Sequence, residues 1–380
     1  MAQQFEKEIC ANLIPENEPE RTAYYLDDIV PGAIPVLAYF ADSGGCGWYR
    51  VKLPAAYVNR DYGQRVNMIV SNFISKEEVL QSNTIPWKAF LLERQHTAES
   101  IRVAEILKLK YNAPIIYEAD DDFFTIHPSA PTKAAYTPEI LANIKKLLKI
   151  TDHMTVSTEP LVKVFNKFCS SVTVIPNAID VEFMKTIAKK KEDYERDEIV
   201  IGWTGGQTHF IDLSIIASTL KDVVLSHKNV KLLIGGWDNC PLFADMPEDK
   251  MIRIPWAHKM RQHYTNLRNI DIGVAPLADV PFNHSKSNIK YLELSAVGIP
   301  TIASDITPYG QTIKHEKNGL LIKASGAVSK QWRDALEYLI ASVKVRKAMG
   351  LAAKDMVYAK YDQKIVSKQW VEFFERVTKK

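Results

Sequence analysis

The sequence predicts an α/β protein built from two doubly wound units in tandem, each a parallel sheet covered by helices. Three observations lead to this prediction. From about residue 35, short apolar runs alternate with longer amphipathic segments, as in βαβ units. The alternation stops at the charged, apolar-poor segment 184–197 and starts again at residue 198. The length of 380 residues fits about two domains.

The first half begins with an apolar strand, a glycine turn at 42–47 and a helical pattern that starts near Trp48. Short runs rich in aliphatic and aromatic residues predict its strands at 34–40, 67–70, 89–92, 113–118, 153–157 and 171–175. Longer amphipathic segments predict helices at 98–110 and 139–150.

The second half repeats this alternation. We expect strands at 198–203, 230–235, 251–255, 270–276, 298–304 and 319–323. We expect helices at 210–227, 259–268, 288–297, 329–339, 343–360 and 363–378. Gly298 is the expected end of the helix before it, because glycine commonly follows the last helical residue.

The composition is that of an ordinary globular protein, with 46% hydrophobic residues, 24% charged residues and a formal net charge of +3. That charge is too small to argue for nucleic acid or a membrane as a partner. The four cysteines, Cys10, Cys46, Cys169 and Cys240, have no C-x-x-C spacing, so neither a disulfide framework nor a zinc site is expected. The N-terminus is polar, and no apolar run approaches the length of a membrane span. We therefore expect a cytoplasmic protein.

The segment from His284 to Asp305 carries the most informative chemistry: a loop, a helix ending at Gly298 and a strand. Lys286, Lys290 and Glu293 lie at i, i+4 and i+7, so they share a face if the helix begins by Lys286. Lysines near a helix N-terminus suit a diphosphate, and a carboxylate one turn further on suits the hydroxyls of a ribose. The alternative is a solvated face on which Glu293 pairs with a lysine.

Three segments resemble the retaining GT-B glycosyltransferases of the family 4 group. They are 290–304, where the family has its donor-site helix and following strand, Ile175-Pro176-Asn177-Ala178-Ile179-Asp180, and Gly319-Leu320-Leu321-Ile322. The resemblance implies two Rossmann-like domains facing a cleft, with a C-terminal helix that crosses back to the N-terminal domain. It implies an acceptor domain at 1–183 joined by 362–380 and a nucleotide-sugar donor domain at 198–361. The charge of the segment 184–197 makes it the expected linker, with a solvated helix end as the alternative.

The resemblance also implies a donor site, with two departures from the family pattern. Ser285 stands where the family has the first glutamate of its E-x7-E pair, and the family's Arg and Lys near residue 204 are absent. His209 is near the place of that lysine, and we take it as a catalytic candidate. The remaining donor-binding candidates are Thr204, Gly205, Gly206, Arg253, Lys286, Asn288, Lys290 and Glu293. Trp256 is expected in the core, with stacking on the base as the alternative.

Two clusters in the first half are candidates for the same cleft. Gly44 and Gly45, between a strand and a helix, would let a donor approach the backbone, or they form only a tight turn. Asp120, Asp121 and Asp122 follow a buried strand and would activate the acceptor hydroxyl or clamp a sugar; the alternative is a helix cap. Arg50 and Arg94 are expected to face the cleft. No His or further acid lies at metal-binding spacing, so no metal is expected.

We therefore predict a glycosyltransferase that takes a sugar from a UDP- or GDP-linked donor, with retention and without a cofactor. A glycan or lipid-linked glycan is the expected acceptor, and a hydroxymethylated base in DNA, as in viral DNA modification, is the alternative. A nucleotide-sugar epimerase and a non-catalytic nucleotide or sugar binder are the alternatives of other classes. Neither the acceptor nor the oligomeric state has a signature in the sequence.

Overall fold

A computed structural model describes residues 29–42, 44–71, 85–128 and 130–379, which fall into two compact units. Unit 1 contains the described residues up to Phe124, Tyr136–Asn177 and the chain from Gln363 onward. Unit 2 contains Thr125–Ala135 and Ala178–Asp362. Cys10 and the polar N-terminus, on which the expectation of no signal peptide rests, lie outside the described residues.

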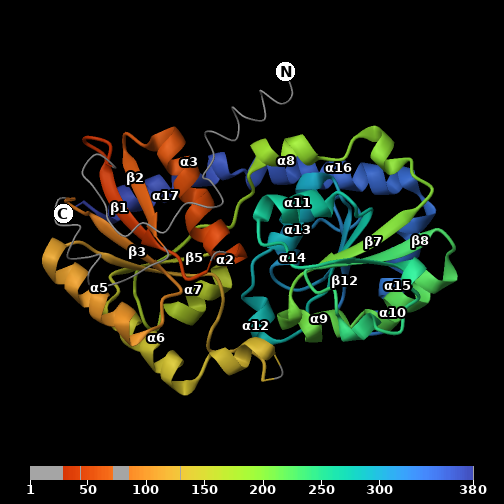
Figure 1. The fold of residues 1–380 in the computed structure, drawn as a ribbon, viewed down its shortest axis with the longest axis horizontal. Helices are drawn as coiled ribbons and strands as arrows, with labels where there is room; N and C mark the ends of the chain where they lie inside the picture. The colour runs from red at the N-terminus through yellow and green to blue at the C-terminus, as the bar shows by residue number, and fades with distance from the viewer. Residues whose placement is uncertain (1–28, 43, 72–84, 129, 380) are drawn as a thin grey trace. The chain divides into compact units, whose positions relative to one another are not determined.

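Unit 1 is built on a parallel six-stranded sheet in the order β2-β1-β3-β4-β5-β6 (Figure 1). Its strands are β1 (Ile34–Tyr39), β2 (Val66–Ser71), β3 (Ala89–Glu93), β4 (Ile115–Ala119), β5 (His153–Val156) and β6 (Val172–Val174). The chain moves outward from β1 to β2 and then returns to the other side of β1 for β3. The sheet therefore has its switch point between β1 and β3.

The helices of unit 1 cover this sheet. They are α2 (Gly45–Gly47), a π-helical turn (Trp48–Lys52), α3 (Leu53–Tyr62), α5 (Ala98–Tyr111), α6 (Pro138–Ile150), α7 (Glu159–Phe165) and α17 (Gln363–Val377). The last helix, α17, packs on α3 and β2, so the C-terminal helix belongs to the N-terminal unit, as expected (Figure 1). Trp370 and Phe374 of α17 are buried there.

Unit 2 is a second parallel sheet, in the order β12-β11-β10-β7-β8-β9. Its strands are β7 (Ile199–Thr204), β8 (Val230–Gly235), β9 (Met251–Ile254), β10 (Ile272–Ala275), β11 (Thr301–Ser304) and β12 (Leu320–Ile322). Read from β9, this is the Rossmann order 3-2-1-4-5-6, with the switch point between β7 and β10. Two doubly wound α/β units in tandem are thereby confirmed.

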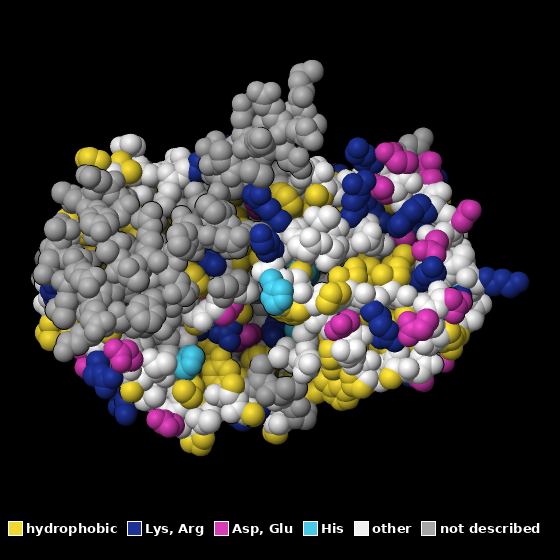
Figure 2. Space-filling model, in the orientation of Figure 1, with side chains coloured by type: hydrophobic (Ala, Val, Ile, Leu, Met, Phe, Trp, Pro, Cys, Tyr) yellow, Lys and Arg dark blue, Asp and Glu magenta, His cyan; other side chains and the backbone are white. Residues whose placement is uncertain are grey.

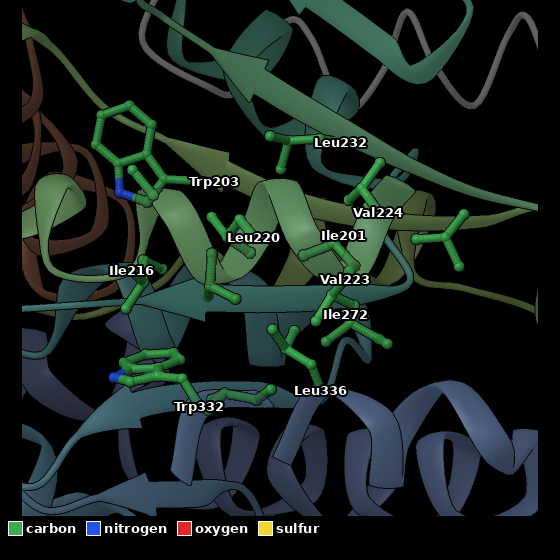
Figure 3. Close-up of a cluster of buried hydrophobic side chains, with 14 of the residues drawn as sticks. Ile201, Trp203, Ile216, Leu220, Val223, Val224, Leu232, Ile272, Trp332 and Leu336 are labelled. Carbon is green, nitrogen blue, oxygen red and sulfur yellow. The ribbon is translucent and has the colours of Figure 1, made fainter. Parts of the chain in front are cut away.

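Helices flank both faces of the second sheet. They are α8 (Val181–Ile187), α9 (Phe210–Ser214), α10 (Ala217–Ser226), α11 (Met260–Leu267), α12 (Pro281–His284), α13 (Ile289–Val297), α14 (Tyr309–Thr312), α15 (Val328–Ala341) and α16 (Val343–Lys360). Short 3₁₀ turns lie at Pro131–Ala135, Lys191–Tyr194, Gln207–His209, Pro241–Phe243 and Glu248–Lys250. Figure 3 shows the core between β7 and its helices, where Leu220 and Val223 of α10 meet Leu336 of α15.

The segment 184–197, expected to be a linker, packs within unit 2. Lys189 is buried and its Nζ lies 2.5 Å from Asp271 Oδ1, and the Tyr194 hydroxyl donates to the Gly298 carbonyl at 2.8 Å. The high charge of the segment, which led us to expect a linker, serves in part to form the ion pair with Asp271.

The surface is mixed in charge. Over the C-terminal unit, Figure 2 shows Lys and Arg side chains interspersed with Asp and Glu, in keeping with the small net charge. Among the described residues, none of the helices is long and apolar enough to cross a membrane.

Candidate functional site

The carboxyl ends of β7 and β10 form the switch point of unit 2, where open α/β sheets bind ligands. The turn Thr204–Gly206 continues β7, and residues 276–288 continue β10 toward α13. The predicted donor residues Thr204, Gly205, Gly206, Lys286, Asn288 and Lys290 lie in these two segments or at the start of α13, and His209 ends the 3₁₀ turn Gln207–His209 that follows Gly206. The sheet topology therefore gathers them at one edge.

Lys290 is tied to the turn after β7. Its Nζ donates to the Thr204 carbonyl at 2.8 Å and lies 5.3 Å from the centre of a Trp203 ring. A Cβ on Gly205 would lie 2.9 Å from this Nζ, so the turn needs glycine for the lysine to approach. Burial lowers the pKa of Lys290 to about 8, with Glu293 opposing this shift and Lys286 adding to it. An anion bound here would restore the charge of the amine.

The structure corrects the expected face of Lys286, Lys290 and Glu293. Helix α13 begins at Ile289, so Lys286 lies in the preceding loop, with its Nζ 4.5 Å from the Phe282 ring centre. The loop itself contains the short helix α12. Lys286 and Lys290 therefore approach the switch point from a loop and from a helix rather than from one helical face.

Asn288 precedes α13, and its side chain donates to Thr312 Oγ1 at 2.9 Å. This bond ties the start of α13 to α14. A donor contact of Asn288 stays a prediction.

Glu293 lies one turn into α13 and is almost fully buried. Its Oε2 is 3.3 Å from Nε2 of His263, a residue of α11 that no motif or spacing in the sequence singles out. The helix does not turn Glu293 to solvent, so the alternative of a solvated salt bridge is wrong. A role in binding ribose stays a prediction.

His209 forms a dyad that the sequence analysis did not identify. Its Nδ1 lies 2.7 Å from Asp212 Oδ2, one helical turn later, at the start of α9. Burial and the neighbouring Lys290 lower the pKa of His209 to about 4, although the bond to Asp212 opposes this shift. The imidazole is therefore neutral at pH 7. The i, i+3 spacing of His and Asp was the signal available in the sequence.

Arg253 and Trp256 flank the end of β9. The Arg253 guanidinium donates to the carbonyls of Asp238 and Phe243, at 3.0 and 2.9 Å. These bonds hold the segment after β8, and a donor contact of Arg253 stays a prediction. Trp256 is 55% exposed, so the expected core position is wrong: it lies past the end of the strand and outside the apolar layer.

In unit 1, the structure corrects the role of Arg50. Its side chain is fully buried: Nε and Nη2 donate to Glu118 of β4, and Nη1 donates to the Ile175 carbonyl and Asn177 Oδ1. The π-helical turn Trp48–Lys52 directs the guanidinium inward, so Arg50 binds elements of unit 1 together instead of reaching a surface. Sequence spacing alone did not reveal this turn.

The glycine turn after β1 uses its glycines unequally. The Gly44 N–H donates to Asp42 Oδ1 at 2.8 Å, whereas a Cβ on Gly45 would meet no atom within 4 Å. A Cβ on Gly47 would lie 1.9 Å from the Asp42 carbonyl oxygen. Gly47 is therefore the glycine that the turn itself requires, and Gly45 leaves open space.

The three aspartates after β4 have different surroundings. Asp120 Oδ1 lies 3.5 Å from Nη1 of Arg94. Asp122 is 4% exposed, and its Oδ1 accepts from the Phe124 N–H at 3.0 Å, which makes it a turn-capping residue. Asp121 is partly buried. Asp120 therefore contacts Arg94 at the end of β3, and the charge of Asp121 also acts on Arg94.

Arg94 is the centre of a polar cluster at that switch point, which we call the Arg94 cluster: Glu93, Arg94, Asp120, Cys46 and Tyr136. Arg94 has a left-handed backbone (φ 49°), and it donates to Cys46 Sγ at 2.6 Å and to the Tyr136 hydroxyl at 2.8 Å. Strained residues of this kind cluster at functional sites.

Glu93, which the sequence analysis missed at the end of an apolar strand, is the fully buried carboxylic acid of the Arg94 cluster. It is 0% exposed, its Oε2 accepts from the Ala41 N–H at 2.7 Å, and its Oε1 is 4.0 Å from Arg94 Nε. Within the described chain, Glu93 Oε1 and Asp120 Oδ1 have no hydrogen-bond partner. Burial, followed by the charge of Asp120, raises the pKa of Glu93 well above its usual range.

Within the described residues, no group of three or more His, Cys, Asp or Glu side chains is arranged to hold a metal ion. Cys46, Cys169 and Cys240 are free thiols.

Known proteins resemble this chain in sequence and in fold. Residues 199–342 match the family described as Glycosyl transferases group 1. An uncharacterized glycosyltransferase of Methanocaldococcus jannaschii is 24% identical over 266 residues, which cover 65% of this chain and 64% of that relative. The match therefore spans slightly less than two thirds of the relative's length.

Solved structures resemble the whole chain. HepE of Anabaena, in complex with UDP and glucose, has a TM-score of 0.63 at 12% identity and covers 90% of this chain and 100% of its own. Sucrose-phosphate synthase of Thermosynechococcus elongatus has a TM-score of 0.64 at 14% identity, with 90% and 98% covered. The two parallel-sheet units thus form a GT-B fold, and the predicted donor residues of unit 2 lie in the segment that matches the group 1 glycosyl transferases.

Proposed function

We propose that this protein transfers a sugar from a nucleotide-sugar donor to an acceptor hydroxyl, because residues 199–342 match the group 1 glycosyl transferases and the fold is GT-B. The observation that carries the proposal is Lys290, a buried amine bonded to the Thr204 carbonyl at the switch point of unit 2. It stands beside the glycine turn and the N-terminus of α13, which together suit a diphosphate.

The chemistry follows from the charge of the leaving group. As the glycosidic bond breaks, the diphosphate gains negative charge, and Lys290 with Lys286 stabilises it more in the transition state than in the ground state. Glu293 binds the ribose hydroxyls in this scheme. We propose retention of configuration from the family resemblance.

The acceptor enters from unit 1 in this proposal, with Asp120 beside Arg94 at the other switch point. A glycan or lipid-linked glycan is the proposed acceptor, and a hydroxymethylated base in DNA is the alternative. UDP-linked donors come first in the test because HepE of Anabaena was crystallised with UDP-glucose.

The test is release of nucleoside diphosphate from a panel of UDP- and GDP-sugars, with and without acceptors. Lys290→Ala should lower kcat/KM by about 10²- to 10³-fold, as removal of one preorganised electrostatic contact does. Lys344→Ala, on an exposed position of α16, is the matched control and should be neutral. Release without any acceptor requirement would favour an epimerase or hydrolase, and binding without release would favour a non-catalytic binder.

In this proposal, lysines and a helix N-terminus stabilise the negative charge of the leaving diphosphate, so turnover should persist in EDTA. Abolition by EDTA with rescue by magnesium or manganese would contradict this part of the mechanism.

A further inference from the structure

Asp212 joins three segments at the switch point of unit 2. It is only 4% exposed, and both of its oxygens are occupied. Oδ2 contacts His209 Nδ1 at 2.7 Å, while Oδ1 accepts from the Ala278 N–H at 2.9 Å and from Asn283 Nδ2 at 2.7 Å. A single buried carboxylate therefore connects His209 to the segment that leads to Lys286.

The bond to Asp212 fixes the tautomer of His209. A carboxylate accepts hydrogen bonds, so the hydrogen of the neutral ring belongs on Nδ1, and Nε2 keeps its lone pair. Burial and the nearby Lys290 hold the pKa of His209 at about 4, and Lys286 acts in the same direction. The ring is therefore an acceptor at Nε2 and carries no charge for a phosphate.

The ring is also fixed in place relative to Lys290. His209 packs edge-on against Trp203, with ring centres 6.2 Å apart, and Lys290 Nζ lies 5.3 Å from a Trp203 ring centre. A group that enters beside Lys290 thus meets an imidazole acceptor rather than a second cation. Among the groups of a sugar nucleotide, only a hydroxyl or an N–H can donate to it.

We propose that Asp212 is a positioning residue that holds His209 with Nε2 as a hydrogen-bond acceptor for a hydroxyl of the donor sugar. The proposal rests on the proposed function for the identity of the ligand, but not for the action of Asp212 on His209. This assigns to His209 the recognition of a hydroxyl in place of contact with phosphate.

The first experiment reads the tautomer without any donor. In the protein labelled with ¹⁵N in its nine histidines, the signals lost in His209→Asn identify the ring. We expect Nδ1–H in the wild type and Nε2–H in Asp212→Asn, because the new amide donates to Nδ1. Asn283→Ala is the matched control: it removes a different partner of Asp212 and should leave the tautomer unchanged. Nε2–H in the wild type, or an unchanged tautomer in Asp212→Asn, overturns the proposal.

The second experiment measures kcat and KM with the donor that the panel identifies and with its deoxy analogues. Asp212→Asn should lower kcat/KM by roughly 10- to 100-fold, as loss of an orienting partner of a functional histidine does. The loss should be much smaller in a His209→Ala background and for the analogue that lacks the recognised hydroxyl. An equal loss in both backgrounds overturns the proposal. If every donor fails while the tautomers behave as expected, the proposed function falls and the action of Asp212 on His209 stands.

Discussion

Burial shifts the pKa of single residues at both switch points. Lys290 loses basicity by burial, His209 is neutral, and Glu93 gains a proton. Burial thus moves the pKa of Lys290 down toward neutral pH, moves that of His209 further below neutral pH, and raises that of Glu93 from its usual range.

Binding of a nucleoside diphosphate should take up a proton through Lys290. Its pKa of about 8 in the free protein rises toward the usual value when an anion binds, so uptake is greatest between about pH 8 and 9 and small below pH 7. Calorimetry at pH 8.5 in two buffers of different ionisation enthalpy measures it. Lys290→Met should abolish the uptake and Lys344→Ala should preserve it. An unchanged proton count in Lys290→Met would mean that the diphosphate binds elsewhere.

Glu93→Gln should stabilise the protein increasingly as pH rises. The folded pKa of Glu93 is raised, so the folded state keeps a proton that the unfolded state has lost above about pH 4.3. The wild type then loses up to about 1.4 kcal/mol per pH unit relative to the Glu93→Gln variant until pH passes the folded pKa. Thermal unfolding at pH 5 to 8 measures the difference, with the exposed Glu139→Gln as control. A difference that does not change with pH would show that Glu93 is ionised in the fold.

At the scale of elements, Gly298 ends α13 and sets the tight connection from this helix to β11. Gly298 has φ 93°, and its N–H bonds the carbonyls of the last helical turn. A Cβ here would also lie 2.7 Å from the Tyr194 hydroxyl oxygen. A side chain at residue 298 is therefore disfavoured both by the positive φ and by the contact with Tyr194.

Gly298→Ala should lower the free energy of unfolding by about 2–3 kcal/mol, since it adds a steric conflict to the strain of positive φ. Gly326, with φ 77° and open space around it, provides the control: Gly326→Ala should cost only the backbone term of about 1 kcal/mol. Denaturant unfolding of both variants separates the two contributions. Equal losses would mean that Tyr194 moves aside freely.

The sequence predicted most elements because each has its own local signal. Gly298 predicted the end of α13, and the apolar runs predicted the strands. The predicted helix 288–297 agrees closely with α13, Ile289–Val297, which leaves Lys286 in the preceding loop. The predicted helix 210–227 is interrupted at residues 215–216, where the chain turns between α9 and α10.

The candidate site was predictable only in part. Lys290 and Glu293 lie in a segment that resembles a known family, so the sequence could indicate them. Glu93 and His263 have partners from other segments, as Asp212 has beyond its i, i+3 neighbour His209, and no spacing along the chain shows those distant contacts. Arg50 was misplaced for the same reason, because its partner Glu118 is 68 residues away.

At the scale of the whole molecule, each unit has its own core and its own switch point. Unit 1 nevertheless depends on helix α17, which follows unit 2 in the sequence. Trp370 is 1% exposed, and its ring lies 5.5 Å from the guanidinium carbon of Arg50. The packing of α17 thus supports the buried ion pair beneath it.

Trp370→Ala should destabilise unit 1 by about 3–5 kcal/mol and leave unit 2 largely unaffected. Trp332, equally buried in unit 2, gives the reciprocal control, since Trp332→Ala should loosen unit 2 alone. Hydrogen exchange resolved by segment measures both. Equal loss of protection in both units from either substitution would show that the protein unfolds as a single body.

The return of α17 also sets the order in which the protein is completed during synthesis. Domains commonly fold from the N-terminus onward as the chain emerges from the ribosome. Here residues 178–362, nearly all of unit 2, emerge before the helix that unit 1 lacks. The sheet of unit 1, which is synthesised first, therefore lacks the helix that packs on α3 until unit 2 has been synthesised. A chain whose translation stops just short of residue 363 would contain all of unit 2 but would lack the helix that completes unit 1.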